Sequence, residues 1–249
     1  MKQRTGWVMV LACGIGVFAS GAAAAQAEYA IRWDPSQGGP KTAAEALARL
    51  APGDNDIETD LFRVRYASEV KAPTDVVGAR AILRERERTS KARHELTYKL
   101  RSNSPLPSVP SFAGAQCPAG PLVGPKDETK DEIDVSFTGA ADPVRAFSRS
   151  CTVQSTSAPP PVPEALQARF AACESTTTRL GLKQRGNLRV EEWRLPGGRV
   201  AIEASRTGPD TPKALKAFRR EVVEPLTTGS NAIRPLSRSK TDLGSDCGT

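Results

Sequence analysis

Histidine is nearly missing from this sequence of 249 residues, and nucleotide-binding loops are missing altogether. The one histidine, His94, alternates onto the same face as Leu96 and Tyr98, which is typical of a packed or surface residue. Any Ser-His-Asp or Cys-His mechanism would have to use it, so neither is expected. The glycine clusters do not suit phosphate binding either, because residues 14–16 lie in an apolar N-terminal segment and residues 197–198 suit a turn.

The chain also lacks any long apolar run after residue 27 and any closely spaced pair of cysteines. A membrane-spanning helix needs about 20 predominantly apolar residues, so no transmembrane segment is predicted after that residue. Neither CxxC pairs nor cysteine and histidine at ligand spacing occur, so a structural zinc site is not expected.

The first 27 residues have the three parts of a secretory signal peptide. A short basic start precedes an apolar run over residues 7–18, and a stretch of small residues ends at Ala25-Gln26-Ala27. We therefore predict a signal peptide over residues 1–27 and a mature chain that begins at Glu28. The protein is expected to be periplasmic or secreted.

A lipoprotein is the alternative for the same segment. Residues 10–13 resemble a lipobox, in which Cys13 would be acylated and become the new N-terminus. The apolar run before Cys13 is only about six residues long, against the usual ~7 to 15. Because the small-residue site downstream is better formed, cleavage before Glu28 is the favoured prediction and anchoring through Cys13 is the alternative.

Positive charges exceed negative charges only mildly and are dispersed along the chain. The 35 lysine and arginine residues and 28 acidic residues give a formal net charge of +7. Removal of residues 1–27 takes away Lys2 and Arg4 and no acidic residue, which leaves +5. Interspersed charges do not form the basic patch of a nucleic-acid-binding protein, so no nucleic-acid partner is predicted. The oligomeric state is not indicated.

Four cysteines remain in the predicted mature chain: Cys117, Cys151, Cys173 and Cys247. An even number in an exported protein favours disulfides, and four cysteines allow three pairings. We predict two structural disulfides and leave the pairing open. Cys247 is the third residue from the C-terminus, where a disulfide would hold a tail that otherwise frays.

Alternating side chains predict a series of strands. Over residues 94–101, Leu96, Tyr98 and Leu100 point one way while Lys99 and its alternating neighbours point the other. Similar patterns, with one shorter extended stretch at the start, predict strands at residues 28–33, 61–66, 80–88, 132–137, 146–154, 182–193 and 199–205. A hairpin turn at residues 195–198 would join the last two.

Helical spacing of apolar residues predicts three helices, at residues 42–50, 164–175 and 212–223. Pro225 is expected to stop the third helix. Residues 102–127 contain six prolines and no periodicity, which predicts a long irregular loop, and residues 227–249 are expected to form a polar C-terminal tail. Residues 28–249 are thus predicted to form a single domain.

About eight strands and three helices, mostly in meander order, predict an α+β fold with a mostly antiparallel sheet. Basic residues recur at alternate positions on at least three strands, and Glu132 and Asp134 do so on another. A sheet with one face in water accounts for such patterns, and periodicity alone favours it. The alternative is a closed barrel that turns the charged faces inward as a tunnel.

Several of these segments, in this order, resemble the CYTH superfamily of triphosphate tunnel metalloenzymes. Residues 83–86 and 95–101 resemble its paired basic strands, and residues 132–134 resemble its acidic strand. Residues 183–185, 190–193 and 198–205 resemble its closing strands. The resemblance implies an eight-stranded antiparallel barrel that forms a tunnel, in which basic residues grip a polyphosphate and carboxylates hold Mg²⁺ or Mn²⁺.

Carried over to this sequence, the resemblance implies phosphate contacts and metal ligands. The implied phosphate contacts are Arg84, Arg86, Lys99, Arg101, Lys183 and Arg185. The implied metal ligands are Glu132, Asp134 and Glu203.

The sequence departs from the family pattern at two places. The opening signature Glu-x-Glu-x-Lys is replaced by residues 28–32, with Ala30 at the middle acid, and Glu203 is flanked at two residues' distance by Ala201 and Ser205. A metal site that lacks two carboxylates is expected to bind weakly or not at all. The sequence therefore predicts a tunnel that binds a small anionic or polyphosphate ligand, with catalysis left open. The alternative is a structural or interaction protein of the bacterial envelope.

Overall fold

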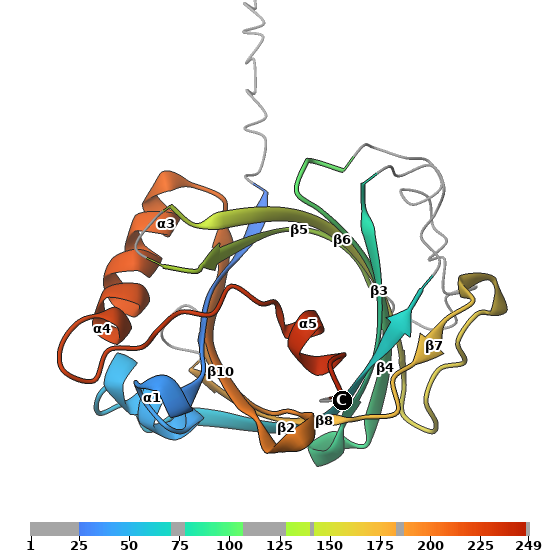
Figure 1. Ribbon diagram of the computed structural model, residues 1–249, viewed down its shortest axis with the longest axis horizontal. Coiled ribbons are helices and arrows are strands. Elements are labelled where there is room, and N and C mark those ends of the chain that lie inside the picture. Colours follow the sequence, from blue (N-terminus) through green and yellow to red (C-terminus); the bar gives the residue numbers. More distant parts are fainter. Residues whose placement is uncertain (1–24, 71–77, 107–127, 140–141, 183–186, 248–249) are drawn as a thin grey trace, which may run out of the picture.

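The computed structural model describes residues 25–70, 78–106, 128–139, 142–182 and 187–247 (Figure 1). Nine of its strands form a closed barrel, and one short strand, β7, lies at the edge. The strands are β1 (Gln26–Trp33), β2 (Ile57–Glu69), β3 (Arg80–Arg88), β4 (Arg93–Ser102), β5 (Glu128–Phe137), β6 (Val144–Ser155), β7 (Arg169–Phe170), β8 (Ser175–Leu182), β9 (Leu188–Arg194) and β10 (Val200–Pro209). The helices are α1 (Ala43–Leu50), α3 (Pro212–Phe218), α4 (Glu224–Thr227) and α5 (Lys240–Gly244).

The barrel follows the order β3-β4-β6-β5-β1-β10-β9-β8-β2 and closes through the pairing of β2 with β3. Neighbouring strands are antiparallel except β1 and β5, which run parallel with Ala27 opposite Ile133. The predicted α+β class with a mostly antiparallel, tunnel-like barrel is confirmed. Periodicity alone favoured a sheet with its charged face in water. This was wrong for β3, β4 and β5, whose charged faces line the barrel cavity, and it holds for β2, where Arg63 and Arg65 are exposed outside the barrel.

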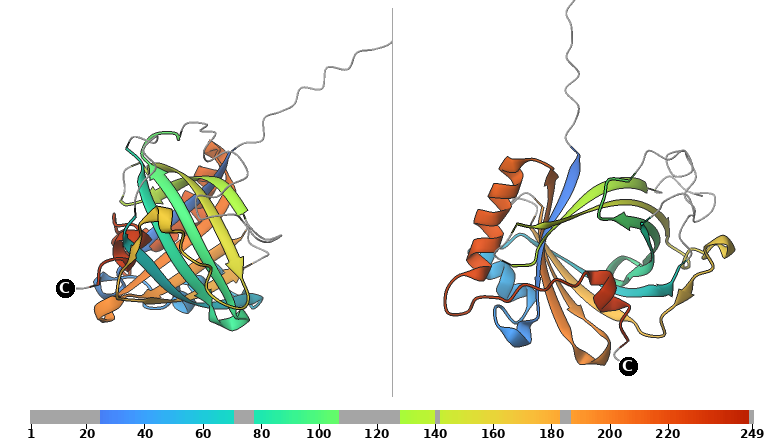
Figure 2. Two further views of the ribbon diagram at one scale, coloured as in Figure 1. Left: turned by 90° about the vertical axis from the view of Figure 1, so that its right-hand side faces the viewer. Right: turned by 45° about the horizontal axis from the view of Figure 1, so that its top comes forward.

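The main hydrophobic core lies outside the barrel rather than within it. On the outside of the barrel, α3 packs on β10, α1 packs on β8 and β9, and α4 lies beside α1 (Figures 1 and 2). Trp33 is fully buried there, and Phe218 stacks on Tyr29 and Phe137 with ring centroids 5.8 and 5.5 Å apart. Because the outward residues of these strands are apolar and buried under helices, the inward residues are free to be polar.

The predicted helix at residues 42–50 and the turn at residues 195–198 are both confirmed. The Thr42 hydroxyl accepts a hydrogen bond from the backbone N–H of Glu45 and so caps α1. Gly197 and Gly198 have φ angles of +74° and +76°, which only glycine adopts at low cost, and the chain reverses there between β9 and β10.

The helix predicted at residues 164–175 is wrong. A single 3₁₀ turn at Glu164–Leu166 is followed by Gln167 in the left-handed region, at φ 42°, which ends helical geometry. The short strand β7 and the start of β8 occupy the rest. Leu166 and Phe170 instead pack on the outer face of β3 and β4. Tertiary contacts therefore override the helical spacing of this segment.

Two further boundaries differ from the predictions. The strand predicted at residues 182–193 is the end of β8 and the whole of β9, with Asn187 at φ 60° before β9. The last helix does not stop at Pro225 but runs to Thr227, through a π-helical turn at Arg219–Val223. The wider turn accommodates a proline that cannot donate the usual backbone hydrogen bond.

The predicted polar tail is ordered over its described part. Ile233 and Leu243 are buried, and residues 240–244 form α5 with a capping box between Ser239 and Asp242. Within the described residues, no helix has both the length and the apolar character needed to cross a membrane. The predicted irregular loop at residues 102–127 lies mostly outside the described residues.

Candidate functional site: the barrel interior

The barrel encloses a cavity of about 280 Å³ that is lined mainly by charged side chains. Among the described residues, nine basic and four acidic side chains line it. The basic ones are Arg32, Arg84, Arg86, Lys99, Arg101, Lys130, Arg179, Arg189 and Lys240, and the acidic ones are Glu28, Glu132, Asp134 and Glu191. The cavity is therefore strongly positive, although the chain as a whole is only mildly basic.

Strand alternation brings most of the predicted site residues together. Arg84 and Arg86 enter the cavity from β3, Lys99 and Arg101 from β4, and the acids of residues 132–134 from β5. These strands lie in the order β3-β4-β6-β5, so the side chains share one wall. Lys183 and Arg185 lie outside the described residues.

Part of the basic wall is neutralised by the acids predicted beside it. Asp134 carboxylate oxygens lie 3.3 Å from Lys99 Nζ and 3.4 Å from Arg101 Nε, and Glu132 lies 2.6 Å from Lys130 Nζ. One carboxylate thus faces two cations, which leaves a net positive charge at this pair of strands.

Arg84 is the basic residue of this wall with the least compensation. Its Nη2 donates to Thr97 Oγ1 at 3.3 Å, its Nε is buried with no acceptor, and no described carboxylate lies within 4 Å of it. Burial, and then the charge of Arg84, lower the pKa of Arg86, which Glu95 opposes through a hydrogen bond of 2.8 Å to Arg86 Nε. Of these two neighbouring guanidinium groups, only that of Arg86 has a carboxylate partner among the described residues.

An aromatic ring fixes two of the arginines. The guanidinium carbons of Arg86 and Arg179 each lie 4.8 Å from the centroid of the Phe62 ring on β2. Asp60, buried two residues earlier on β2, accepts from Arg179 at 2.5 Å and from Arg88. The cation–π contacts and the ion pairs hold these guanidinium groups in place without a ligand.

The floor of the cavity is a buried cluster of ion pairs around Lys240. Its Nζ lies 2.8 Å from Glu191 and also pairs with Glu203, which is 2% exposed and pairs with Arg32 as well. Burial is the largest effect on Glu191 and raises its pKa, but Lys240, Arg179 and Arg86 together outweigh burial and lower the pKa to about 2. Burial raises the pKa of Glu203 more than its two cations lower it, and the acids hold the pKa of Lys240 well above its usual range despite burial.

The three implied metal ligands do not converge. Glu132 pairs with Lys130, Asp134 with Lys99, and Glu203 with Arg32 and Lys240. In the part of the chain that the structure describes, no three acidic, histidine or cysteine side chains form a group suited to a metal ion. These carboxylates act as counter-ions in this arrangement and do not fit the Mg²⁺ or Mn²⁺ site that the resemblance implies.

Five basic residues of the cavity were not among the predicted phosphate contacts. Arg32 lies on β1, Lys130 on β5, Arg179 on β8 and Arg189 on β9, and Lys240 comes from the tail. Arg179 continues the alternation of Thr177 along β8, a signal hidden by the helix predicted over the start of that strand. Lys240 carried no signal, because only long-range packing brings α5 to the barrel.

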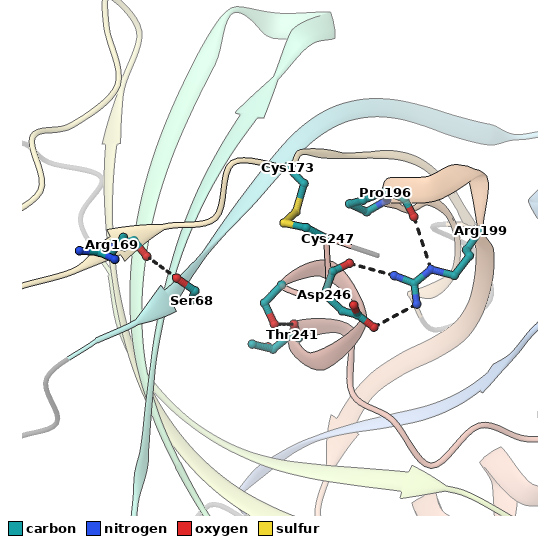
Figure 3. Close-up of a disulfide and its surroundings, with 9 residues drawn as sticks. Ser68, Arg169, Cys173, Pro196, Arg199, Thr241, Asp246 and Cys247 are labelled. Carbon is teal, nitrogen blue, oxygen red and sulfur yellow. Dashed lines mark hydrogen bonds and ion pairs between the residues drawn. A yellow bond between two sulfur atoms is a disulfide. The ribbon is translucent and has the colours of Figure 1, made fainter. Parts of the chain in front are cut away.

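The tail is joined to the barrel by a disulfide between Cys173 and Cys247, shown in Figure 3. The prediction that Cys247 bonds to hold the tail is confirmed. Cys151 is fully buried on β6 and is also disulfide-bonded. Cys117 lies outside the described residues.

The comparisons with known proteins identify no family. No protein-family model matches the sequence, and no curated protein matches it. A conserved hypothetical protein from Pyrococcus furiosus shares 12% identity at a TM-score of 0.45, over 87% of this chain and 99% of the other. The PH1819 protein from Pyrococcus horikoshii OT3 shares 11% identity at a TM-score of 0.44, over 87% of this chain and 97% of the other. Likeness at this level carries no argument about function.

Proposed function

We propose that this chain is an exported, CYTH-like tunnel domain that binds a phosphorylated or otherwise polyanionic small ligand inside its barrel. The observation that carries the proposal is the excess of basic over acidic side chains around the cavity. Most of these cations have a carboxylate partner, and the excess of positive charge that remains favours an anion in the cavity.

Arg84 supports this proposal most directly. A buried guanidinium nitrogen without an acceptor costs free energy, on the order of 1–3 kcal/mol, unless a partner satisfies it. The Arg84 side chain also lines the cavity, so a phosphate oxygen there could accept from the part of its guanidinium that faces the cavity, and the same anion would contact Arg86 and Lys99 of the same wall. A triphosphate carries about four negative charges, which matches a wall of several fixed cations in a partly desolvated space.

The ion pairs favour binding over hydrolysis. The resemblance implies a triphosphate hydrolase that depends on Mg²⁺ or Mn²⁺, but Glu132, Asp134 and Glu203 are each held by basic side chains. We therefore propose a binding protein, and hydrolysis is the outcome that a phosphate-release assay with Mg²⁺ would reveal. The proposal favours binding over a purely structural role because basic side chains outnumber acidic ones around the cavity.

The test is calorimetric titration of the purified mature chain with inorganic tripolyphosphate. We expect saturable binding, and Arg84→Gln should weaken it about tenfold or more, the loss of one charge-assisted hydrogen bond. Arg63→Gln is the matched control, since Arg63 lies on the outer face of β2 with its side chain 59% exposed. That variant should bind like the wild type.

Two results would overturn the proposal. One is the lack of any binding heat together with no rise in melting temperature at millimolar tripolyphosphate. The other is equal weakening by Arg84→Gln and Arg63→Gln, which would place the anion on the outer surface rather than in the cavity.

A further inference from the structure

The C-terminal tail closes one end of the tunnel. After the last long helix the chain crosses the barrel, and α5 lies in its mouth (Figure 1). Leu243 packs among the apolar residues at this end with Tyr66 and Trp193, and Lys240 and Thr241 line the cavity. The tail is therefore part of the proposed binding site.

Few ion pairs hold the C-terminal tail, residues 236–247, against the barrel. A five-residue helix is not stable by itself, so α5 depends on its attachments. Asp246 pairs with Arg199 at 3.1 Å, Asp242 pairs with Arg80, and both pairs are about one-third or more exposed (Figure 3). Such pairs contribute little. The strong attachments are the Cys173–Cys247 disulfide, the Lys240 ion pairs and the burial of Leu243 and Gly244 against Tyr66.

The disulfide lies where a reductant can reach it. Cys173 and Cys247 are both half-buried, near the end of the chain and at the edge of the barrel, whereas Cys151 is fully buried. Thiol exchange requires access to a sulfur atom, so Cys173–Cys247 is the bond exposed to it.

We propose that the Cys173–Cys247 disulfide is a redox-sensitive latch, whose reduction releases the tail, withdraws Lys240 from the tunnel and lowers the affinity of the tunnel for anions. The inference rests on the proposed function of the same cavity. The reductant is a dithiol. One thiolate of the dithiol attacks a sulfur of the disulfide, forms a mixed disulfide with that cysteine and releases the other cysteine as a thiolate. The second thiolate of the dithiol then attacks its own sulfur in the mixed disulfide and releases the remaining cysteine. The dithiol is oxidised to a disulfide, and Cys173 and Cys247 each end as thiols.

Charge explains the direction of the effect. With the tail docked, the Lys240 ammonium neutralises Glu191 and Glu203 and leaves the cavity positive. With the tail released, the cavity loses the Lys240 ammonium. Glu203 keeps its ion pair with Arg32, and Glu191 loses its ion pair with Lys240. We expect the affinity for a polyphosphate to fall about tenfold, the effect of one charge at about 10 Å in a medium of intermediate dielectric.

Two measurements on the purified chain test the latch. Hydrogen exchange over residues 236–247 reports tail release without any ligand, and titration with tripolyphosphate reports affinity. The clean reduced state is the Cys173→Ser/Cys247→Ser variant, because dithiothreitol acts on every accessible disulfide. Fluorescence of Trp193 is a third readout, since Lys240 Nζ lies 5.5 Å from the centroid of its ring in the docked tail.

Lys240→Met is the matched control, because it removes the charge and keeps the disulfide. We expect the double serine variant to lose exchange protection in the tail and about tenfold in affinity, and Lys240→Met to lose similar affinity with the tail still tethered. Unchanged protection from hydrogen exchange over residues 236–247 in the double serine variant would overturn the proposed latch. Release of the tail with unchanged or higher affinity would overturn the proposed regulation. Failure of every form to bind tripolyphosphate, with tail release still seen in exchange, would reject the proposed function separately.

Discussion

At the floor of the tunnel, the buried ion pair of Glu191 with Lys240 makes the stability of the protein depend on pH. Glu191 and Lys240 are a buried pair whose ionised forms stabilise each other, so the folded state binds protons differently from the unfolded chain. The pKa of Glu191 is lowered from 4.5 to about 2, and its contribution is therefore fully present above about pH 4.5. It is lost as the pH falls towards 2.

Glu191→Gln should make this linkage visible. Near pH 7 the variant should lose about 3 kcal/mol of unfolding free energy, the equivalent of the lowered pKa. At pH 3 the difference from the wild type should be much smaller, because the wild type has lost part of the same contribution. Urea unfolding at the two pH values measures this. Glu174→Gln, at a side chain that is 43% exposed, is the control, and a difference that does not depend on pH would contradict the account.

Gly244 is a second residue on which the tail depends. A Cβ atom there would lie 2.6 and 2.7 Å from two ring carbons of Tyr66, which is 2% exposed and cannot move freely. Gly244→Ala should destabilise the docked tail by about 1–3 kcal/mol, the usual cost of overpacking. Hydrogen exchange in the tail and the melting temperature measure it. Gly208→Ala, where a Cβ meets nothing within 4 Å, should be close to neutral, and equal effects would refute the close-approach argument.

At the scale of elements, β1 begins before the predicted mature start. Gln26 lies opposite Pro209 and Ala27 opposite Gly208, Ala27 is fully buried, and the N–H of Asp210 donates to the Ala25 carbonyl at 2.7 Å. Cleavage after Ala27 would remove these pairs, whereas cleavage after Ala25 would keep every residue of the strand.

We therefore predict that cleavage of the proposed signal peptide leaves Gln26 as the first residue. Ala23-Ala24-Ala25 provides small residues for that site as well as Ala25-Gln26-Ala27 does for the other. The intact mass of protein recovered from the periplasm distinguishes the two starts. A protein that begins at Glu28 would show that the end of β1 is dispensable, and an acylated Cys13 would establish the lipoprotein alternative.

Alternation predicted β3 closely, whereas helical spacing succeeded at residues 42–50 and failed at residues 164–175. Over residues 80–88, arginines recur at every second position from Arg84 to Arg88, and this alternation marks the strand. In residues 164–175, Leu166 and Phe170 are spaced as in a helix, yet Leu166 lies in a 3₁₀ turn and Phe170 in β7, and both pack on the outer face of β3 and β4. The spacing of apolar residues indicates which residues are buried. In a short segment it does not indicate whether those residues lie in a helix, a strand or a turn.

At the scale of the whole molecule, the main hydrophobic core lies outside the barrel, and charged side chains line the cavity inside it. That arrangement predicts a steep response to salt, because the proposed ligand is bound by several fixed cations and not by apolar surface. Raising sodium chloride from 0.05 to 0.5 M should weaken tripolyphosphate binding by about tenfold or more as charges are screened. Titration at several salt concentrations measures the slope. Affinity that is insensitive to salt would contradict an electrostatic tunnel.

The sequence by itself determined which face of each strand is charged. Lys99 with Arg101 and Glu132 with Asp134 alternate with apolar neighbours, Arg84 alternates with Arg86 across Glu85, and this local pattern is the same in any arrangement of the strands. It could not decide whether the charged face meets water or a cavity, because both give the same alternation. Closure of β2 on β3 decided that, and docking of the tail added Lys240 from far along the chain. Both depend on packing between residues distant in sequence, which no local pattern records.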